Sequence, residues 1–201
     1  MTNKVYEIKV SLKNIEPEIW RTFKINGKSS FYELHAVIQL VMGWYDSHLF
    51  EFENKNYRIG ESDPDFDAEY ESKLTEADDI TVEEVLIRKG SSINYLYDFG
   101  DHWEHQIKVV DIIKNEIILY PVCTGGKRNC PPEDCGGIGG YEHLLGIVKN
   151  KKHPEYSEMM EWLGGEYDPE QFEIDIINKS LNGTIMDNFE DIDFEDDSDD
   201  I

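Results

Sequence analysis

The sequence is short of positive charge, of cysteine pairs and of long hydrophobic runs. Its 201 residues include 19 Lys and Arg against 43 Asp and Glu, a net charge of −24. Binding to nucleic-acid phosphates needs a basic face, so this charge argues against direct nucleic-acid binding. No apolar run approaches the roughly 20 residues of a membrane-spanning helix, so we expect no membrane insertion. The three cysteines are an odd number and no secretory signal is visible, so we expect a reduced, cytoplasmic protein.

Much of the acidic charge lies in two runs. Residues 187–201 hold nine acidic side chains and no basic one, and residues 61–79 hold nine acids and one base. Runs of like charge are usually solvated chain without a core of their own. The sequence therefore predicts one domain over residues 1–185 and a disordered acidic tail over residues 186–201. The alternative is that the acidic segments act as a decoy for a basic or DNA-binding protein.

The hydrophobic pattern changes between the alternation of strands and the spacing of helices. Residues 6–12 alternate apolar and polar side chains, which predicts a half-buried strand. Ser30 and Glu33 form a capping-box signature ahead of helically spaced apolar residues, and Gly43 is expected to end that helix. Further strands are expected at 17–25, 49–53, 57–59, 93–99, 103–110 and 117–122. Further helices are expected after Thr81 and over 141–148, 154–163 and 168–181. Because the strands come mostly in consecutive pairs, we expect an α+β domain with a largely antiparallel sheet of about five to seven strands and a helical C-terminal part.

Residues 97–105 read Tyr-Asp-Phe-Gly-Asp-His-Trp-Glu-His and concentrate ionisable side chains. The Asp-Phe-Gly triplet is found in the kinase magnesium loop, but the other kinase motifs are missing. On a strand, Asp101 and His105 share one face and His102 points the other way. We favour a core histidine at His105, bonded to Asp98 or Asp101, with His102 exposed. The alternative is that both histidines bind zinc.

Residues 123–140 form a glycine-rich segment that contains all three cysteines. Six residues separate Cys123 from Cys130 and four separate Cys130 from Cys135, unlike the two-residue spacing of common zinc knuckles. Three thiolates together with His105 would still complete a tetrahedral zinc site. The alternative is that the cysteines pack as small hydrophobic side chains in a glycine-permitted loop.

The same segment carries Arg128, one of only four arginines, followed by Glu133 and Asp134. We favour an arginine–carboxylate clamp that holds the loop closed over a catalytic role for these residues. The glycine run at 136–140 precedes an expected helix, whose free amides could bind an anion, but it is no dinucleotide fingerprint.

At these stretches the sequence resembles a known family, the plasmid pRiA4b ORF-3-like proteins, over about residues 4–182. The resemblance rests on Ile19-Trp20-Arg21, residues 34–39, Gly43-Trp44, residues 48–52, residues 97–105, Cys123-Thr-Gly-Gly, residues 131–137, Tyr141, residues 162–164 and Phe172. The family's signature residues correspond to Trp20, Arg21, His35, Gln39, Trp44, His48, Asp98, Asp101, Trp103, His105, Glu133 and Asp134. The resemblance implies an association with plasmids and other mobile elements. Some members carry a transposon-resolvase label, but this chain lacks the basic surface that a resolvase needs.

Three functional hypotheses follow. The first is a non-enzymatic binding or accessory domain with a polar-aromatic pocket for a small ligand or a protein. The residues expected to line this pocket are Trp44, His48, Asp98, Asp101, Trp103, His105, Arg128, Glu133 and Asp134. The second is a zinc-type protein, either a metal-dependent hydrolase that uses His48, His105 and Asp98 or Asp101, or a structural zinc site at Cys123, Cys130, Cys135 and His105. The third is the acidic decoy.

Overall fold

A computed structural model describes residues 3–62 and 74–190 of the chain and contains one eight-stranded sheet. The strands are β1 (Lys4–Leu12), β2 (Trp20–Asn26), β3 (Phe50–Glu53), β4 (Arg58–Gly60), β5 (Thr75–Glu76), β6 (Ser92–Tyr97), β7 (Trp103–Lys114) and β8 (Val122–Lys127). Their order across the sheet is β5-β4-β3-β6-β7-β1-β2-β8. Every neighbouring pair is antiparallel except β4 and β5. The α+β class and the antiparallel sheet are confirmed, with more strands than the sequence predicted because the short edge strand β5 carries no pattern of its own.

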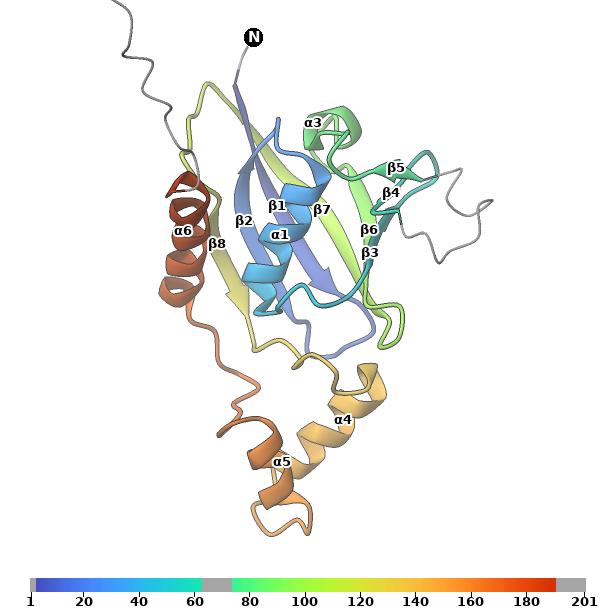
Figure 1. Cartoon of the computed structure of the whole chain (residues 1–201), viewed down its shortest axis with the longest axis vertical. Helices are drawn as coiled ribbons and strands as arrows, with labels where there is room; N and C mark the ends of the chain where they lie inside the picture. Colours follow the sequence, from blue (N-terminus) through green and yellow to red (C-terminus); the bar gives the residue numbers. More distant parts are fainter. Residues whose placement is uncertain (1–2, 63–73, 191–201) are drawn as a thin grey trace, which may run out of the picture.

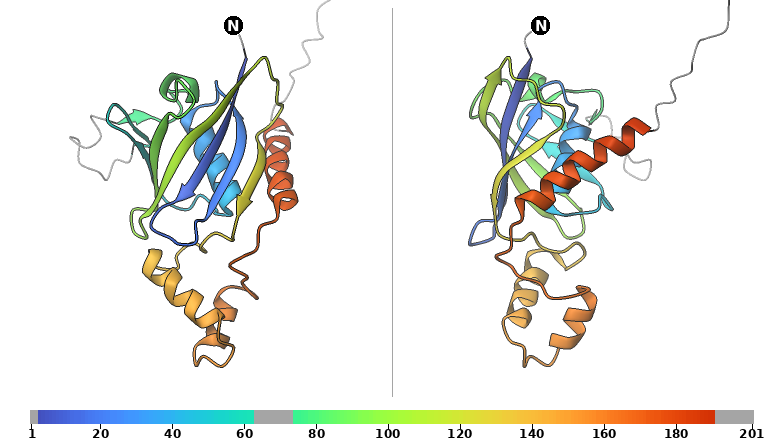
Figure 2. Two further views of the ribbon diagram at one scale, coloured as in Figure 1. Left: turned by 180° about the vertical axis from the view of Figure 1, so that it is seen from behind. Right: turned by 90° about the vertical axis from the view of Figure 1, so that its left-hand side faces the viewer.

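The described helices are α1 (Phe31–Met42), α3 (Val82–Val85), α4 (Gly137–Val148), α5 (Tyr156–Trp162) and α6 (Ile174–Glu190). Helix α1 crosses one face of the sheet, and the opposite face carries none of the described helices (Figures 1 and 2). Helices α4 and α5 form a small lobe beyond one end of the strands, and α6 returns beside β8 (Figure 1). None of the described helices is long and apolar enough to cross a membrane.

The capping box at the start of α1 is present as the sequence predicts. The Ser30 side chain accepts a hydrogen bond from the Glu33 amide at 3.1 Å, and the Ser30 amide donates to the Glu33 carboxylate at 2.8 Å. Gly43 ends the helix with a φ of 81°, a left-handed conformation that glycine adopts without strain. The apolar face of α1 is fully buried against the sheet, where Ile8 and Val10 of β1 are also 0% exposed. The main core therefore lies between α1 and the sheet.

Two helix predictions and one strand prediction need correction. Helix α3 ends at Val85 rather than near Gly90, because the Gly90 amide donates to the Val109 carbonyl and is drawn onto β7. Helix α6 begins at Ile174 rather than at Asp168, because residues 168–171 form a separate turn in which the Gln171 amide donates to the Asp168 carbonyl at 3.2 Å, and the Pro169 carbonyl accepts from the Asn129 amide. The strand expected at 117–122 lies further along the chain, as β8 at Val122–Lys127. It includes part of the cysteine–glycine segment that was expected to be a loop.

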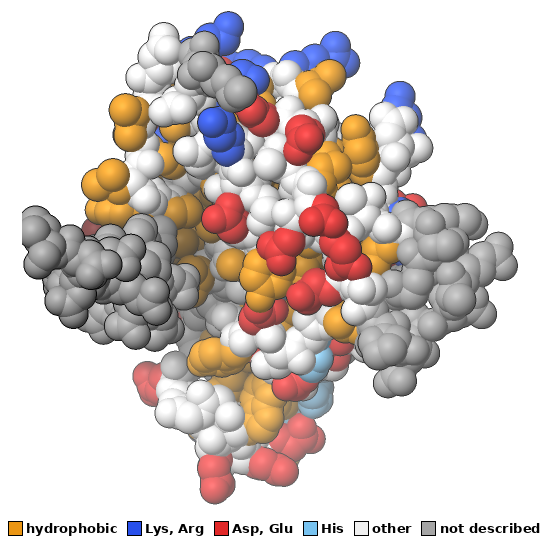
Figure 3. Space-filling view, turned by 45° about the horizontal axis from the view of Figure 1, so that its top comes forward, with side chains coloured by type: hydrophobic (Ala, Val, Ile, Leu, Met, Phe, Trp, Pro, Cys, Tyr) orange, Lys and Arg blue, Asp and Glu red, His pale blue; other side chains and the backbone are white. Residues whose placement is uncertain are grey.

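Charge is unevenly distributed over the surface. In the space-filling view, Asp and Glu side chains gather across the middle of one face, and Lys and Arg gather along its upper edge (Figure 3). The pKa of Glu61 is raised by its burial and, after that, by the like charges of Asp46, Asp78 and Glu76. The predicted tail beyond Glu190 and most of the acidic run at 61–79 lie outside the described residues.

Candidate functional site

A closed ring of hydrogen bonds fixes the segment that follows α1. The Gln39 side-chain amide donates to the Tyr95 hydroxyl at 2.9 Å, and that hydroxyl lies 2.8 Å from His35 Nδ1. His35 Nε2 lies 2.6 Å from Asp46 Oδ1, and the Asp46 amide donates to Gln39 Oε1 at 3.1 Å. These contacts are all satisfied if neutral His35 carries its proton on Nε2. The hydrogen bond from His35 also lowers the pKa of Asp46. The ring holds residues 44–48 in place from within the core.

The cysteine–glycine segment closes onto this part of the chain through Pro131 and Glu133. The Trp44 indole donates to the Pro131 carbonyl at 2.9 Å. The Tyr97 hydroxyl donates to Glu133 Oε1, and the Tyr45 amide donates to Glu133 Oε2 at 2.9 Å. Burial, followed by the bond to Glu133, raises the pKa of Tyr97, so the hydroxyl stays a donor. Each oxygen of Glu133 therefore accepts one hydrogen bond.

A second contact joins the segment to the turn between β6 and β7. The Gly136 amide donates to Asp101 Oδ2 at 3.1 Å. A Cβ at Gly137 would stand 2.5 Å from the Asp101 carbonyl oxygen, and Gly137 also has a φ of 65°. Only glycine fits this close approach in that conformation without strain. The two stretches that were expected to contribute residues to one pocket therefore lie against each other.

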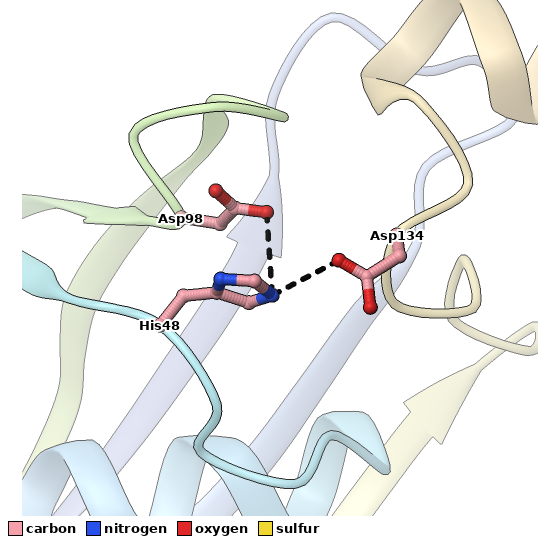
Figure 4. Close-up of side chains that lie close together, drawn as sticks. All are labelled: His48, Asp98 and Asp134. Atoms are coloured by element: carbon pink, nitrogen blue, oxygen red, sulfur yellow. Dashed lines mark hydrogen bonds and ion pairs between the residues drawn. The ribbon is translucent and has the colours of Figure 1, made fainter.

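Where the three segments meet, the side chains of His48, Asp98 and Asp134 converge, and we call them the rim triad (Figure 4). His48 Nε2 lies 3.1 Å from Asp134 Oδ1 and 3.7 Å from Asp98 Oδ2. One ligand atom from each residue lies within 4.8 Å of the others. Asp98 and Asp134 both have a φ of 57°, so each carboxylate extends from a turn in the left-handed region.

The three side chains of the rim triad differ in their exposure to solvent. The Asp134 side chain is 71% exposed, that of His48 is 30% exposed and that of Asp98 is 11% exposed. The Gly100 amide donates to Asp98 Oδ1 at 2.8 Å. That bond orients the least exposed carboxylate and leaves its other oxygen facing His48.

The aromatic residues expected to line a pocket are packed in the core instead. Trp44 stacks on Tyr97 with ring centroids 5.0 Å apart and meets His105 edge-on at 5.3 Å. Trp103 is 1% exposed and His105 is 0% exposed. The space between the polar rim and the sheet is thus filled by rings, which corrects the prediction that Trp44, Trp103 and His105 line an open pocket.

His105 is a core histidine, as the favoured prediction held, but without the expected partners. Neither ring nitrogen makes a hydrogen bond of normal geometry to the described residues, and the same is true of Trp103 Nε1. Burial lowers the pKa of His105 to about 3, so its ring stays neutral. The predicted bond to Asp98 or Asp101 is therefore wrong, although His102 is exposed as predicted.

The three cysteines have separate surroundings. Cys130 Sγ lies 3.1 Å from Arg21 Nη2, while the thiols of Cys123 and Cys135 lie nearest to backbone carbonyls of their own segment. Burial raises the pKa of Cys130 to about 11 and that of Cys135 to about 12, so both remain protonated. Among the side chains of residues 3–62 and 74–183, only the rim triad assembles three potential metal ligands. The structure does not bring the cysteines and His105 together as a zinc site.

Arg128 forms a carboxylate clamp, but with a different partner from the one predicted. Its Nε donates to Glu170 at 2.8 Å, and its Nη1 donates to the Pro17 carbonyl at 2.9 Å. Its backbone has a φ of 66°. The side chain therefore ties the end of β8 to the segment before α6 instead of reaching Glu133 or Asp134, and it is not part of the site.

Sequence reasoning missed the residues that support the site from within. Asp46 and the hydroxyls of Tyr95 and Tyr97 carry much of the hydrogen bonding described above. The available signal was the spacing of the two tyrosines, which alternate on β6 and so face the same side of the sheet.

Sequence and structure comparisons place the chain among similar proteins. A family model described as plasmid pRiA4b ORF-3-like protein matches residues 4–176. The uncharacterized protein y4hQ of Sinorhizobium fredii (strain NBRC 101917 / NGR234) is 31% identical over 188 residues, which cover 90% of this chain and 93% of that protein. The crystal structure of MM3350, a protein of unknown function from Methanosarcina mazei Go1, has a TM-score of 0.76 and 36% identity, and the match covers 87% of this chain and 98% of that one. The likeness thus extends over nearly all of the described fold.

Proposed function

The chain belongs to the plasmid pRiA4b ORF-3-like family, and from this premise we propose that it is a binding domain whose rim triad holds one divalent metal ion, with zinc as the best fit. One observation carries the proposal: an imidazole nitrogen and two carboxylate oxygens from three distant segments lie within 4.8 Å of one another. Imidazole and carboxylate are ligands that zinc accepts. Three protein ligands leave a coordination position for water or for a donor atom of a partner.

The arrangement of the carboxylates supports a cation over a simple hydrogen-bond network. His48 Nε2 is within hydrogen-bonding distance of Asp134 only, because 3.7 Å to Asp98 is too long for a hydrogen bond. The Asp98 oxygen that faces His48 is thus left with a weak interaction, while its other oxygen is held by the Gly100 amide. A hydrogen bond that orients a ligating carboxylate in this way is typical of metal sites.

The hydrogen bonds made by a carboxylate beside the rim triad favour a binding function over hydrolysis. A metal-dependent hydrolase needs a carboxylate or imidazole that is free to accept a proton from the attacking water. Both oxygens of Glu133, the carboxylate next to Asp134, already accept hydrogen bonds from Tyr97 and Tyr45. The hydrolase therefore ranks second among the proposals.

Zinc titration of untagged, chelator-treated protein tests the proposal. We expect one zinc ion per chain, and at least tenfold weaker binding after His48→Ala or Asp134→Asn, since each removes a ligand. Asp175→Asn is the matched control, because Asp175 is an exposed carboxylate on α6 outside the rim triad. Equal zinc affinity in wild type, Asp134→Asn and Asp175→Asn would show that the rim triad is not the site.

A further inference from the structure

Arg21, in the Trp20-Arg21 motif of β2, is a buried cation that the rim triad does not use. It is 3% exposed. Its Nε donates to the Val41 carbonyl at 2.9 Å, and its Nη1 donates to the carbonyls of Trp20 and Lys127 at 2.9 and 3.0 Å. Its Nη2 donates to Cys130 Sγ at 3.1 Å. Among the side chains of residues 3–62 and 74–183, no carboxylate forms an ion pair with this guanidinium.

The missing carboxylate is unexpected in a chain with 43 acidic residues. Arg58 and Arg128 each bond a glutamate directly, whereas Arg21 has only neutral acceptors. Burial raises the pKa of Cys130 to about 11, so its thiol accepts a hydrogen bond but brings no negative charge. Carbonyl dipoles compensate a buried cation only in part. A positive charge therefore remains available for an anion.

Arg21 borders a hollow of about 330 Å³ between the end of α1, the segment before α6 and the first turns of α6. The apolar part of its wall comes from Leu40, Val41, Met42, Phe172, Ile176 and Ile177. The Phe172 ring lies against the guanidinium, 4.9 Å from its carbon to the ring centroid. Glu173 also lines the hollow, but its carboxylate accepts a hydrogen bond from Gln171 rather than from Arg21. The volume lies at the lower end of the range for small-ligand sites.

We propose that this hollow binds a small organic carboxylate, whose carboxylate group meets Arg21 and whose aliphatic body packs against Phe172 and α6. The Nη2 group has two N–H donors, and Cys130 takes one of them. A hydrogen bond between the other and a carboxylate would be charge-assisted on both sides and therefore strong. One free guanidinium N–H among apolar walls suits a monoanion with an aliphatic chain better than it suits phosphate. This site is separate from the rim triad and does not depend on metal binding.

Titration of the full chain with hexanoate, followed by NMR or calorimetry, tests the proposal. We expect saturable binding with a dissociation constant below about 1 mM, and at least tenfold weaker binding of hexanamide, which has the same chain without the charge. Equal affinity for hexanoate and hexanamide would overturn the proposal, and so would the absence of saturable hexanoate binding or tighter binding of inorganic phosphate.

A variant that fills the hollow locates the binding without removing Arg21, whose loss would leave several carbonyls unpaired. Ile176 lines the hollow and is 56% exposed, so Ile176→Trp is expected to fold and to weaken hexanoate binding at least tenfold. Lys179→Trp places the same side chain on an exposed position of α6 outside the lining and should leave binding unchanged. Hexanoate affinity that responds equally to both variants, or to neither, would contradict the assignment.

Discussion

His48 and His105 lie close to one aromatic layer but in opposite surroundings. His48 contacts the edge of Tyr97, is 30% exposed and stands between two carboxylates. Trp44 stacks on the same tyrosine and meets His105, which is 0% exposed and makes no hydrogen bond of normal geometry to the described residues. The first histidine keeps part of its hydration and has polar neighbours, whereas the second has lost all of its hydration and packs among rings. The layer of rings thus separates the rim triad, where we propose that a metal ion binds, from a neutral interior.

Trp44→Ala tests the packing of the interior rings and is expected to have the largest effect on the free energy of unfolding. The substitution removes the ring between Tyr97 and His105 and the hydrogen bond to Pro131. Truncation of a buried tryptophan typically costs about 3–5 kcal/mol of the free energy of unfolding, which urea denaturation would measure. Trp162→Ala is the control, since Trp162 is 50% exposed and its loss should cost far less. Equal costs would mean that Trp44 does not hold the interior together.

His105→Leu tests whether the interior histidine is neutral. In the folded state its pKa is lowered from 6.5 to about 3, so between these values the unfolded chain binds a proton that the folded chain does not. The stability that this difference contributes is complete above pH 6.5 and falls by about 1.4 kcal/mol for each pH unit below it. From pH 7 to pH 5 the wild type should therefore lose about 2 kcal/mol more than His105→Leu.

Unfolding measurements at the two pH values provide the check. His102→Leu is the control, because it makes the same substitution at a histidine whose side chain is 60% exposed. Parallel stability profiles for wild type and His105→Leu would show that the interior histidine takes up its proton as readily when folded as when unfolded.

Tyr95→Phe tests the closed hydrogen-bond ring, which supports the rim from the interior. Loss of the hydroxyl leaves His35 Nδ1 and the Gln39 amide without their buried partner. An unsatisfied buried group costs about 1–3 kcal/mol, and we expect about 1.5 kcal/mol here. Thermal or urea unfolding measures the loss, with Tyr57→Phe, on a half-buried tyrosine outside the ring, as the control. A loss no greater than that of the control would mean that the ring adds no stability.

Local sequence rules correctly predicted the elements that depend on side chains close together in the sequence. The capping box of Ser30 and Glu33, the stop at Gly43 and the alternation along β1 depend on side chains a few residues apart, and all are present. Arg128 shows where such rules end, because its partner Glu170 lies 42 residues further along the chain. No spacing near Arg128 distinguishes that glutamate from the nearer acids in so acidic a sequence.

The site was predicted in outline for a similar reason. All members of the rim triad were among the expected pocket residues. Asp98 and Asp134 lie in the two turn-rich stretches where polar side chains gather, whereas His48 was identified only through the family resemblance. Which of them meet, and that Trp44 and His105 fill the space behind them, depends on the packing of large rings. The hydrogen-bond ring was missed because Tyr95 reads as an apolar strand position until its hydroxyl is matched with His35.

Asp134→Asn tests the rim side and should have the smallest effect on the metal-free fold. Its side chain is 71% exposed, and exposed ion pairs contribute about 0–1 kcal/mol, so we expect a change within about 0.5 kcal/mol without metal. With zinc at about 100 times the dissociation constant, the wild type should gain about 2.7 kcal/mol, and Asp134→Asn should gain less than half of that. Thermal unfolding with and without zinc separates the two quantities, with Asp175→Asn expected to behave as the wild type. The opposite result would be a loss of several kcal/mol of stability without metal, together with the full stabilisation by zinc. It would mean that the rim triad stabilises the fold as the interior does, and that His48 and His105 do not differ in the way described above.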